Sequence, residues 1–223
     1  VTGEFTDEAN FSGRMLKSRG NMDFVLAKYS PEGKLLWLQT AGGSKIDRGY
    51  SVAVDAAGNS YVTGHFQSPE FWIGDKVFTN RGDYDYFVAK YDVDGEFQWA
   101  HRGGGKGYDY GHGIAVTPDG DVYVAGSFSG DVTFGEAKST IAKGKSIFVA
   151  RYRTDGQLVW SRLAGNDRAQ SGHNIAVGPD GDCYVSGYVS GVVQLGNRKF
   201  GSPTNVKDIF VARLNPDGDL VWA

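Results

Sequence analysis

Three short segments carry the residue types with the greatest capacity for chemistry, and they recur at a regular spacing. They are Asp47-Arg48-Gly49-Tyr50, Asp109-Tyr110-Gly111-His112 and Gln170-Ser171-Gly172-His173, which begin 62 and 61 residues apart. Carboxylate oxygens and imidazole nitrogens from such segments can together hold a divalent cation or a polar ligand. The candidate ligand-binding residues are therefore Asp47, Tyr50, Asp109, His112 and His173.

The same residues also have a purely structural interpretation. Short acidic side chains beside glycines commonly accept hydrogen bonds from turn amides, and the His and Tyr rings can pack against a neighbouring element. A residue type that returns in every repeat usually meets a structural need that returns with it. The sequence predicts no cofactor, no resident metal and no catalytic residue, and a divalent cation at these positions stays open as the alternative.

Four regularly spaced tryptophans mark the repeated structural units that position these residues. Trp37, Trp99, Trp160 and Trp222 fall 62, 61 and 62 residues apart, and each closes a similar phrase. One such phrase runs from Asp85 to Trp99 and contains Phe-Val-Ala-Lys-Tyr, a turn that ends in Gly95, and the tryptophan. A glycine that can adopt a positive φ closes a tight turn, so each phrase predicts a β-hairpin.

A second hairpin precedes the first in each complete unit. Residues 51–54, 113–116 and 174–177 are short β-branched runs, and each is followed by a Gly-containing turn and a returning strand such as Tyr123-Val124-Ala125-Gly126. This arrangement gives four strands in each unit, and no window has a helical period. A four-stranded antiparallel unit repeated at this period is typical of a β-propeller blade, with a solenoid as the main competitor.

The predicted fold is thus an all-β propeller of about four repeats within one domain, residues 1–223. The approximate units are residues 1–48, 49–110, 111–171 and 172–223. Three are complete blades, and the first lacks its first strand because Val1-Thr2-Gly3 aligns with Val62-Thr63-Gly64. An incomplete blade exposes a strand edge and an apolar face that monomers normally cover.

Three explanations of the missing strand remain open. The chain is a piece of a larger propeller, a closed ring of four blades, or a homo-oligomer that completes a larger ring. The absence of Met at position 1 favours an excised or processed piece, with which association is compatible.

The repeated phrases resemble the SBBP family of seven-bladed β-propeller repeats. The stretches from Asp85 to Trp99, Gly104 to Asp109 and Ile114 to Phe128 carry the resemblance almost without a gap. It implies a bacterial protein that is secreted or exposed at the cell surface, and it implies no activity. Gln170 departs from the acid at Asp47 and Asp109, and Ser146 departs from the acid at Asp23, Asp85 and Asp208.

The net charge and the lengths of the apolar stretches argue against some classes of partner. The net charge is −3 with both signs interspersed, which speaks against nucleic acid as a partner, and no apolar stretch is long enough for membrane insertion. The single Cys183 is expected to be a small packing residue. We expect a non-catalytic scaffold or interaction module that binds protein or polysaccharide through its loops. The alternatives are a self-assembling propeller half and a lyase- or hydrolase-type enzyme with a site at the channel mouth.

Overall fold

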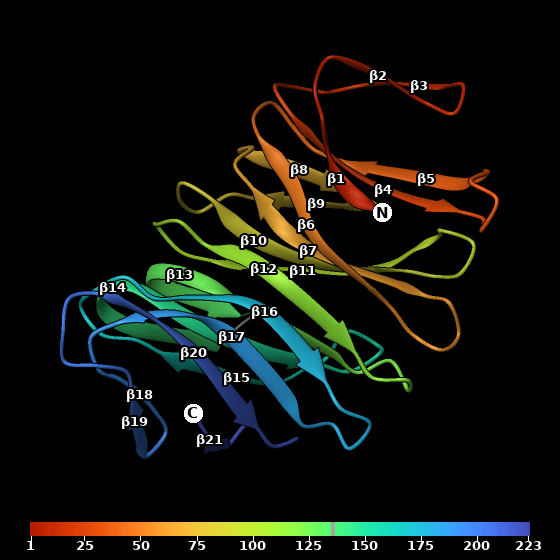
Figure 1. The fold of residues 1–223 in the computed structure, drawn as a ribbon. Coiled ribbons are helices and arrows are strands. Elements are labelled where there is room, and N and C mark those ends of the chain that lie inside the picture. Colours follow the sequence, from red (N-terminus) through yellow and green to blue (C-terminus); the bar gives the residue numbers. More distant parts are fainter. Residues whose placement is uncertain (135–136) are drawn as a thin grey trace.

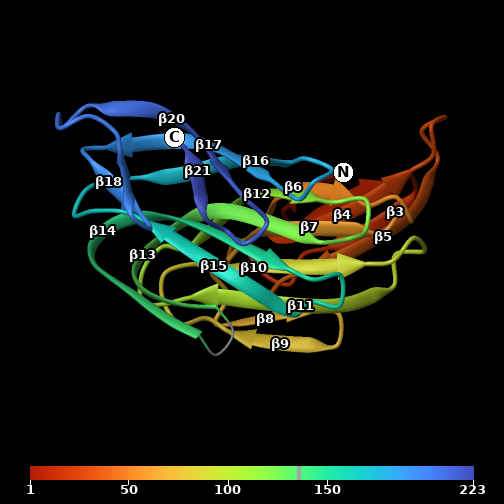
Figure 2. The ribbon, with the colours of Figure 1, turned by 90° about the horizontal axis from the view of Figure 1, so that it is seen from below.

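The computed structural model describes residues 1–134 and 137–223, and all its regular elements are β-strands (Figure 1). They form antiparallel sheets that follow one another in chain order and fan out as an open arc (Figures 1 and 2). The fold is a β-propeller arrangement of three four-stranded blades preceded by a three-stranded one, as the repeats predict.

The first blade has the order β1-β4-β5, and its three strands are equivalent to strands two to four of the others. The second blade is β6-β7-β10-β11, the third β12-β13-β14-β15 and the fourth β16-β17-β20-β21. The bounds are β1 Thr2–Phe5, β4 Asp23–Tyr29, β5 Leu35–Ala41, β6 Asp47–Val54, β7 Ser60–Phe66, β10 Asp85–Tyr91, β11 Phe97–Gly104, β12 Tyr110–Val116, β13 Val122–Phe134, β14 Ala137–Tyr152, β15 Leu158–Ala164, β16 Ser171–Val177, β17 Cys183–Ser190, β20 Lys207–Leu214 and β21 Leu220–Trp222.

The long connections between the second and third strands of each blade are hairpins rather than irregular loops. In blades one, two and four they are separate pairs: β2 Glu8–Phe11 with β3 Arg14–Lys17, β8 Glu70–Ile73 with β9 Lys76–Thr79, and β18 Val193–Leu195 with β19 Arg198–Phe200. In blade three β13 and β14 themselves extend into the hairpin, with a register shift between Ser129 and Asp131, and Phe134 pairs with Gly103 of β11. Phe71 and Phe134 are buried, so these aromatics anchor the hairpins, whereas Trp72 is exposed.

The core lies between blades rather than within them. Phe24, Leu26 and Trp37 of the first blade pack against Phe87 and other apolar residues of the second, and two further clusters of this kind join blades two to three and three to four. Because alternate side chains of a strand point to opposite faces, each sheet contributes one face to the preceding blade and one to the following blade. Cys183 belongs to the last of these clusters, in agreement with the expected packing role.

The outer turns connect adjacent blades. In the turns that end at Gly33, Gly95, Gly156 and Gly218, the glycine donates its backbone N–H to the residue three positions before it and has a φ between 80° and 88°. The Trp37 indole donates to the carbonyl of Val93 in the next blade at 3.0 Å, and Trp99 and Trp160 repeat this bond with Thr154 and Pro216. Three of the four periodic tryptophans, Trp37, Trp99 and Trp160, therefore mark contacts between blades.

Candidate functional site

The innermost strands β6, β12 and β16 lie side by side near the centre of the arc (Figure 1). The register of each with its partner strand shifts at one residue: Tyr50 between Gly49 and Ser51, His112 between Gly111 and Gly113, and His173 between Gly172 and Asn174. A bulge of this type bends a strand and redirects the side chain of the extra residue. The structure places all three residues within the inner strands.

The bulges bring aromatic rings from several blades into contact. The His112 ring stacks on the His173 ring with centroids 5.1 Å apart and contacts Tyr50 at 5.5 Å and Tyr110 at 5.3 Å. His173 in turn contacts Tyr188 at 5.4 Å. Three of the five predicted residues, Tyr50, His112 and His173, are thus brought together across three blades.

The contacts continue beyond the predicted residues. His65 contacts Tyr50, Tyr84 and Tyr110 at centroid distances between 4.7 and 5.1 Å. We call this set the aromatic row, and its members are Tyr50, His65, Tyr84, Tyr110, His112, His173 and Tyr188. Offset and edge-to-face ring pairs at these distances each contribute about 0.5–1.5 kcal/mol beyond area burial, so the row stabilises the inner strands as well as shaping a surface.

Two lysines lie over the row. The Lys145 Nζ is 4.8 Å from the centroid of the Tyr110 ring, and the Lys207 Nζ is 4.3 Å from that of Tyr188. A third cation, Arg48, lies 3.6 Å from the Glu4 carboxylate. Neither lysine forms a salt bridge with any residue that the structure describes. The rim of the row is consequently electropositive.

Burial keeps the histidines of the row neutral near pH 7. It lowers the pKa of His65 to about 3 and that of His112 to about 4, and it lowers the pKa of His173 as well. A neutral imidazole offers one donor and one acceptor nitrogen. The row therefore presents polar, uncharged ring edges beside the ammonium groups of Lys145 and Lys207.

The predicted acids lie in separate buried networks instead of joining the rings. The carboxylate of Asp47 accepts hydrogen bonds from the Gly43, Gln67 and Ser68 amides and from the Ser68 hydroxyl at 2.6 Å. Asp109 accepts from the Gly105 and Ser129 amides. Burial raises the pKa of both carboxyls, that of Asp109 to about 7. These contacts favour the amide-capping interpretation of the two acids.

The departure at Gln170 supports the same interpretation. Its side-chain oxygen accepts from the Asn166 amide at 3.3 Å, in the place where Asp47 and Asp109 accept from Gly43 and Gly105. An uncharged acceptor can serve there because the position needs an oxygen that receives N–H donors. Over the described part of the chain, no three His, Cys, Asp or Glu side chains are grouped closely enough to hold a metal ion.

Sequence reasoning missed Tyr110, although it lies beside the predicted Asp109, and it also missed His65, Tyr84, Tyr188, Lys145 and Lys207. The signal of these last five residues lies in two alignment columns. The column one residue before Asp23, Asp85, Ser146 and Asp208 holds Met22, Tyr84, Lys145 and Lys207. The second-strand column that contains His65 holds Glu4, Ser127 and Tyr188 in the other blades. The residue types in these two columns differ from blade to blade, whereas the neighbouring Val and Ala columns stay apolar. This indicates that packing between blades does not restrict the residue type at these two positions.

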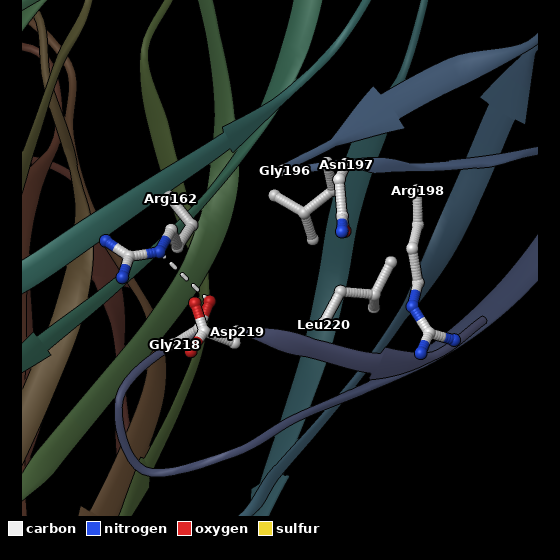
Figure 3. Close-up of a pocket in the computed structure, with 8 residues that line it drawn as sticks. Arg162, Gly196, Asn197, Arg198, Gly218, Asp219 and Leu220 are labelled. Atoms are coloured by element: carbon white, nitrogen blue, oxygen red, sulfur yellow. Dashed lines mark hydrogen bonds between the residues drawn. The ribbon is translucent and has the colours of Figure 1, made fainter.

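A separate pocket of about 390 Å³ lies at the outer edge between blades three and four (Figure 3). Its lining includes Arg162, Arg198, Asp219 and Leu220. Arg162 is already engaged, because its Nε donates to the Gly218 carbonyl at 3.0 Å and its Nη2 donates to the carbonyl of Asp217. The pocket is thus shaped by a contact between blades.

One serine and histidine approach each other in the row. The Ser127 hydroxyl lies 3.3 Å from the His112 Nε2. A serine nucleophile must reach its substrate, and Ser127 is fully buried. This pair therefore gives no support to a hydrolase.

Comparison with known proteins agrees with the repeat architecture. Residues 37–65 match the SBBP beta-propeller repeat family, which confirms the resemblance seen in the repeated phrases. The regulatory protein FlaEY of Caulobacter vibrioides is 28% identical over 152 residues, which cover 67% of this chain and 16% of FlaEY. An uncharacterized WD repeat-containing protein, L264, of Acanthamoeba polyphaga mimivirus is 22% identical over 229 residues, which cover 86% of this chain and 16% of that protein.

This chain therefore spans about one-sixth of the length of these two curated relatives. A protein of unknown function from Bacteroides caccae has a crystal structure that aligns with 93% of this chain and 75% of its own, at 10% identity and a TM-score of 0.35. In the described residues, no helix has the length and apolar character needed to cross a membrane.

Proposed function

We propose that this chain, which is built on the SBBP-type β-propeller repeat, is a non-catalytic binding module that holds an acidic polysaccharide along its aromatic row. The observation that carries the proposal is the row itself, in which rings from three blades meet beside the ammonium groups of Lys145 and Lys207. Propeller-type repeats and relatives described as regulatory or WD-repeat proteins support an interaction role.

The rings suit the hydroxyl groups of a sugar polymer. Tyr50 and His173 are exposed, and Tyr110, His112 and Tyr188 are partly exposed, so phenol and imidazole edges are accessible over several blades. Phenol and imidazole groups can both donate and accept hydrogen bonds, as sugar hydroxyls do. A row that crosses several strands matches an extended polymer better than a compact small molecule.

The lysines suit carboxylates on that polymer. Burial and the nearby Lys207 ammonium lower the pKa of Lys145, so the two cations are close enough to repel each other. An anion between them would relieve this repulsion and form charge-assisted hydrogen bonds. A location outside the cell or at its surface, which would bring the module to such polymers, is part of the proposal.

Binding to polygalacturonate, a polymer of uronic acids, tests the proposal, with neutral dextran as the comparison. We expect calorimetry to detect binding to polygalacturonate and none to dextran, with an affinity that falls as the salt concentration rises. Replacing both cations, Lys145→Met and Lys207→Met, keeps the aliphatic stems and should weaken binding about tenfold or more, given about 1.5–3 kcal/mol for a charged hydrogen bond.

The matched control is the pair Lys17→Met and Lys34→Met, which removes the same charge from exposed positions on the first blade. That variant should bind nearly as well as the unaltered chain. Equal weakening in both double variants would show a general charge effect, and the proposed site would then be wrong.

A further inference from the structure

Two buried carboxyl groups lie close together where blade two meets blade three. Asp85 begins β10 of blade two, and Asp109 directly precedes β12 of blade three. Neither residue has any exposed surface. A Cβ added to Gly104, at the end of β11, would lie 2.4 Å from Oδ1 of Asp85 and 3.0 Å from Oδ2 of Asp109, so both oxygens lie close to one point. We call Asp85 and Asp109 the acid pair.

Asp85 has partners for only one of its two oxygens. Its Oδ2 accepts a hydrogen bond from the Arg81 amide at 3.1 Å and forms a salt bridge with Nη1 of Arg102 at 2.9 Å. Its Oδ1 is buried and has no hydrogen-bond partner among the described residues. The charge of Arg102 therefore balances one carboxylate of the acid pair and leaves nothing for a second.

The charged and titratable groups around Asp109 do not balance that second carboxylate. Asp109 accepts only two amide hydrogen bonds, and the cation that faces it, Lys145, forms no salt bridge within the described chain. Its neighbours Tyr86 and Tyr110 stay neutral, because burial raises the pKa of Tyr110 to about 12 and raises that of Tyr86 as well. Two negative charges so close together in a buried interface disfavour each other's ionisation.

The interface between blades one and two holds an equivalent pair, Asp23 and Asp47, with more hydrogen bonds. Asp47 accepts four of them, from three amides and the Ser68 hydroxyl, whereas Asp109 accepts two. Hydrogen bonds to a carboxylate favour its ionised form. Asp109 is thus the acid with the weaker support for a negative charge.

The interface between blades three and four has the same architecture without these charges. Ser146 and Gln170 replace the two acids of the pair, and Leu163 takes the place of Arg102. Neutral residues at these three positions allow the blades to pack, so the fold itself does not require the charges. Their presence in the middle interface calls for another explanation.

We propose that the acid pair holds one proton in the folded protein and forms a pH-sensitive joint, which weakens the contact between blades two and three as the pH rises to neutrality. With the proton bound, the pair carries a single negative charge, and the salt bridge from Arg102 balances it. After the proton leaves, a second negative charge lies buried in the interface with two amide hydrogen bonds to support it.

The sign of the pH effect follows from a comparison with the unfolded chain. There an aspartate ionises near its ordinary pKa of 3.8, whereas burial raises the pKa of Asp109 in the folded protein to about 7. Between these two values the folded protein binds a proton that the unfolded chain has lost. Stability therefore falls as the pH rises through this range and changes no further above it.

Copying the neutral interface into the middle one tests the proposal. The triple variant Asp85→Ser, Arg102→Leu and Asp109→Gln receives the residues that the chain already uses between blades three and four. Urea unfolding followed by circular dichroism gives the unfolding equilibrium constant at each pH. We expect the constant of the unaltered chain, divided by that of the variant, to rise about tenfold per unit from pH 5 to 6.5 and to level off above pH 7.5.

The matched control makes the same kinds of change at exposed positions: Asp75→Ser, Lys17→Leu and Asp167→Gln. These side chains are in water in both the folded and the unfolded chain. The ratio of the unfolding constants of the unaltered chain and this control should therefore stay within about twofold over the same pH range.

Carbon-13 NMR of the unaltered chain, labelled at the aspartate carboxyl carbons, gives a readout that does not depend on the triple variant folding. One carboxyl should titrate near pH 7, and the single variant Asp109→Gln should lack that signal. A ratio of unfolding constants that stays flat with pH, or a spectrum in which every aspartate titrates below pH 5, would overturn the proposal. Stabilisation of the unaltered chain by calcium chloride, absent from the triple variant, would also overturn it, because a cation and not a proton would then neutralise the pair.

Discussion

The indole nitrogens illustrate how much a residue's role depends on its neighbours. Trp99 and Trp222 occupy the same position in their blades, yet Trp99 is buried and donates to the Thr154 carbonyl, while Trp222 is exposed. Intramolecular hydrogen bonds contribute about 0.5–1.5 kcal/mol each, and loss of buried ring volume adds a cavity cost. The two tryptophans should therefore differ in their effect on stability.

Replacement of each by phenylalanine checks this difference. We expect Trp99→Phe to lower the free energy of unfolding by about 1–3 kcal/mol, and Trp222→Phe to change it by less than about 0.5 kcal/mol in dilute solution. Urea unfolding followed by circular dichroism measures both values. Equal losses of unfolding free energy in the two variants would show that the hydrogen bond from Trp99 to the Thr154 carbonyl does not stabilise the protein.

A second prediction at the residue scale concerns His65 and the pH dependence of folding stability. It is 2% exposed, its Nδ1 has no hydrogen-bond partner in the described structure, and burial lowers its pKa from the usual 6.5 to about 3. Below pH 6.5 the unfolded chain binds a proton there that the folded chain does not. His65 therefore costs stability as the pH falls from about 6.5 towards 3.

The variant His65→Phe removes this titration. Its free energy of unfolding, taken relative to the unaltered chain at each pH, should rise by about 1.4 kcal/mol per unit as the pH falls from 6 to 4. Buried carboxyls such as Asp109 titrate in the opposite sense in both proteins, and taking the difference cancels them. A difference that stays constant over this range would contradict a neutral buried imidazole.

At the scale of elements, the outer turns of the blades share one conformation but have different surroundings. Gly33 and Gly95 have φ values of 83° and 85°. An alanine at either position suffers the left-handed backbone cost of about 1–2 kcal/mol. Only at Gly95 does the added Cβ also collide with a buried tryptophan ring, that of Trp37.

Gly95→Ala should consequently destabilise the protein by about 1–3 kcal/mol more than Gly33→Ala does, since overpacking of a filled site adds a cost of that size. Urea denaturation of the two variants, followed by circular dichroism, gives the comparison. Identical losses would imply that Trp37 moves aside without cost.

At the scale of the whole molecule, the blades form a linear series in which each contacts its neighbours. Stability in such arrays is approximately a sum of unit terms and nearest-neighbour interface terms. The second and third blades have both faces covered, whereas the last has its Ile209 and Val211 face open. The last blade should therefore open more readily than the middle blades.

Hydrogen exchange measures this difference in opening between the last blade and the middle blades. Amides of β20 should exchange about tenfold or more faster than those of β10, because opening the last blade breaks one interface and opening the second breaks two. Equal protection of the two strands in the monomer would argue against stepwise opening.

The sequence alone determined the blade architecture. Four tryptophans, four glycine turns and alternating apolar columns are local signals that return with every unit, so hairpins, blade count and the missing first strand of the first blade were all predictable. Tyr50, His112 and His173 were found in the same way, because the repeat marks equivalent positions.

Only the tertiary structure decided what those positions contact. One extra residue in each inner strand turns Tyr50, His112 and His173 towards a common row, and bulges of this kind leave little trace in a residue pattern. In the packed structure, Asp47 and Asp109 accept hydrogen bonds from backbone amides. His65, Lys145 and Lys207 lie against the aromatic row. The physical reason is that contacts between blades join residues about 60 positions apart, and their geometry follows from how whole sheets pack.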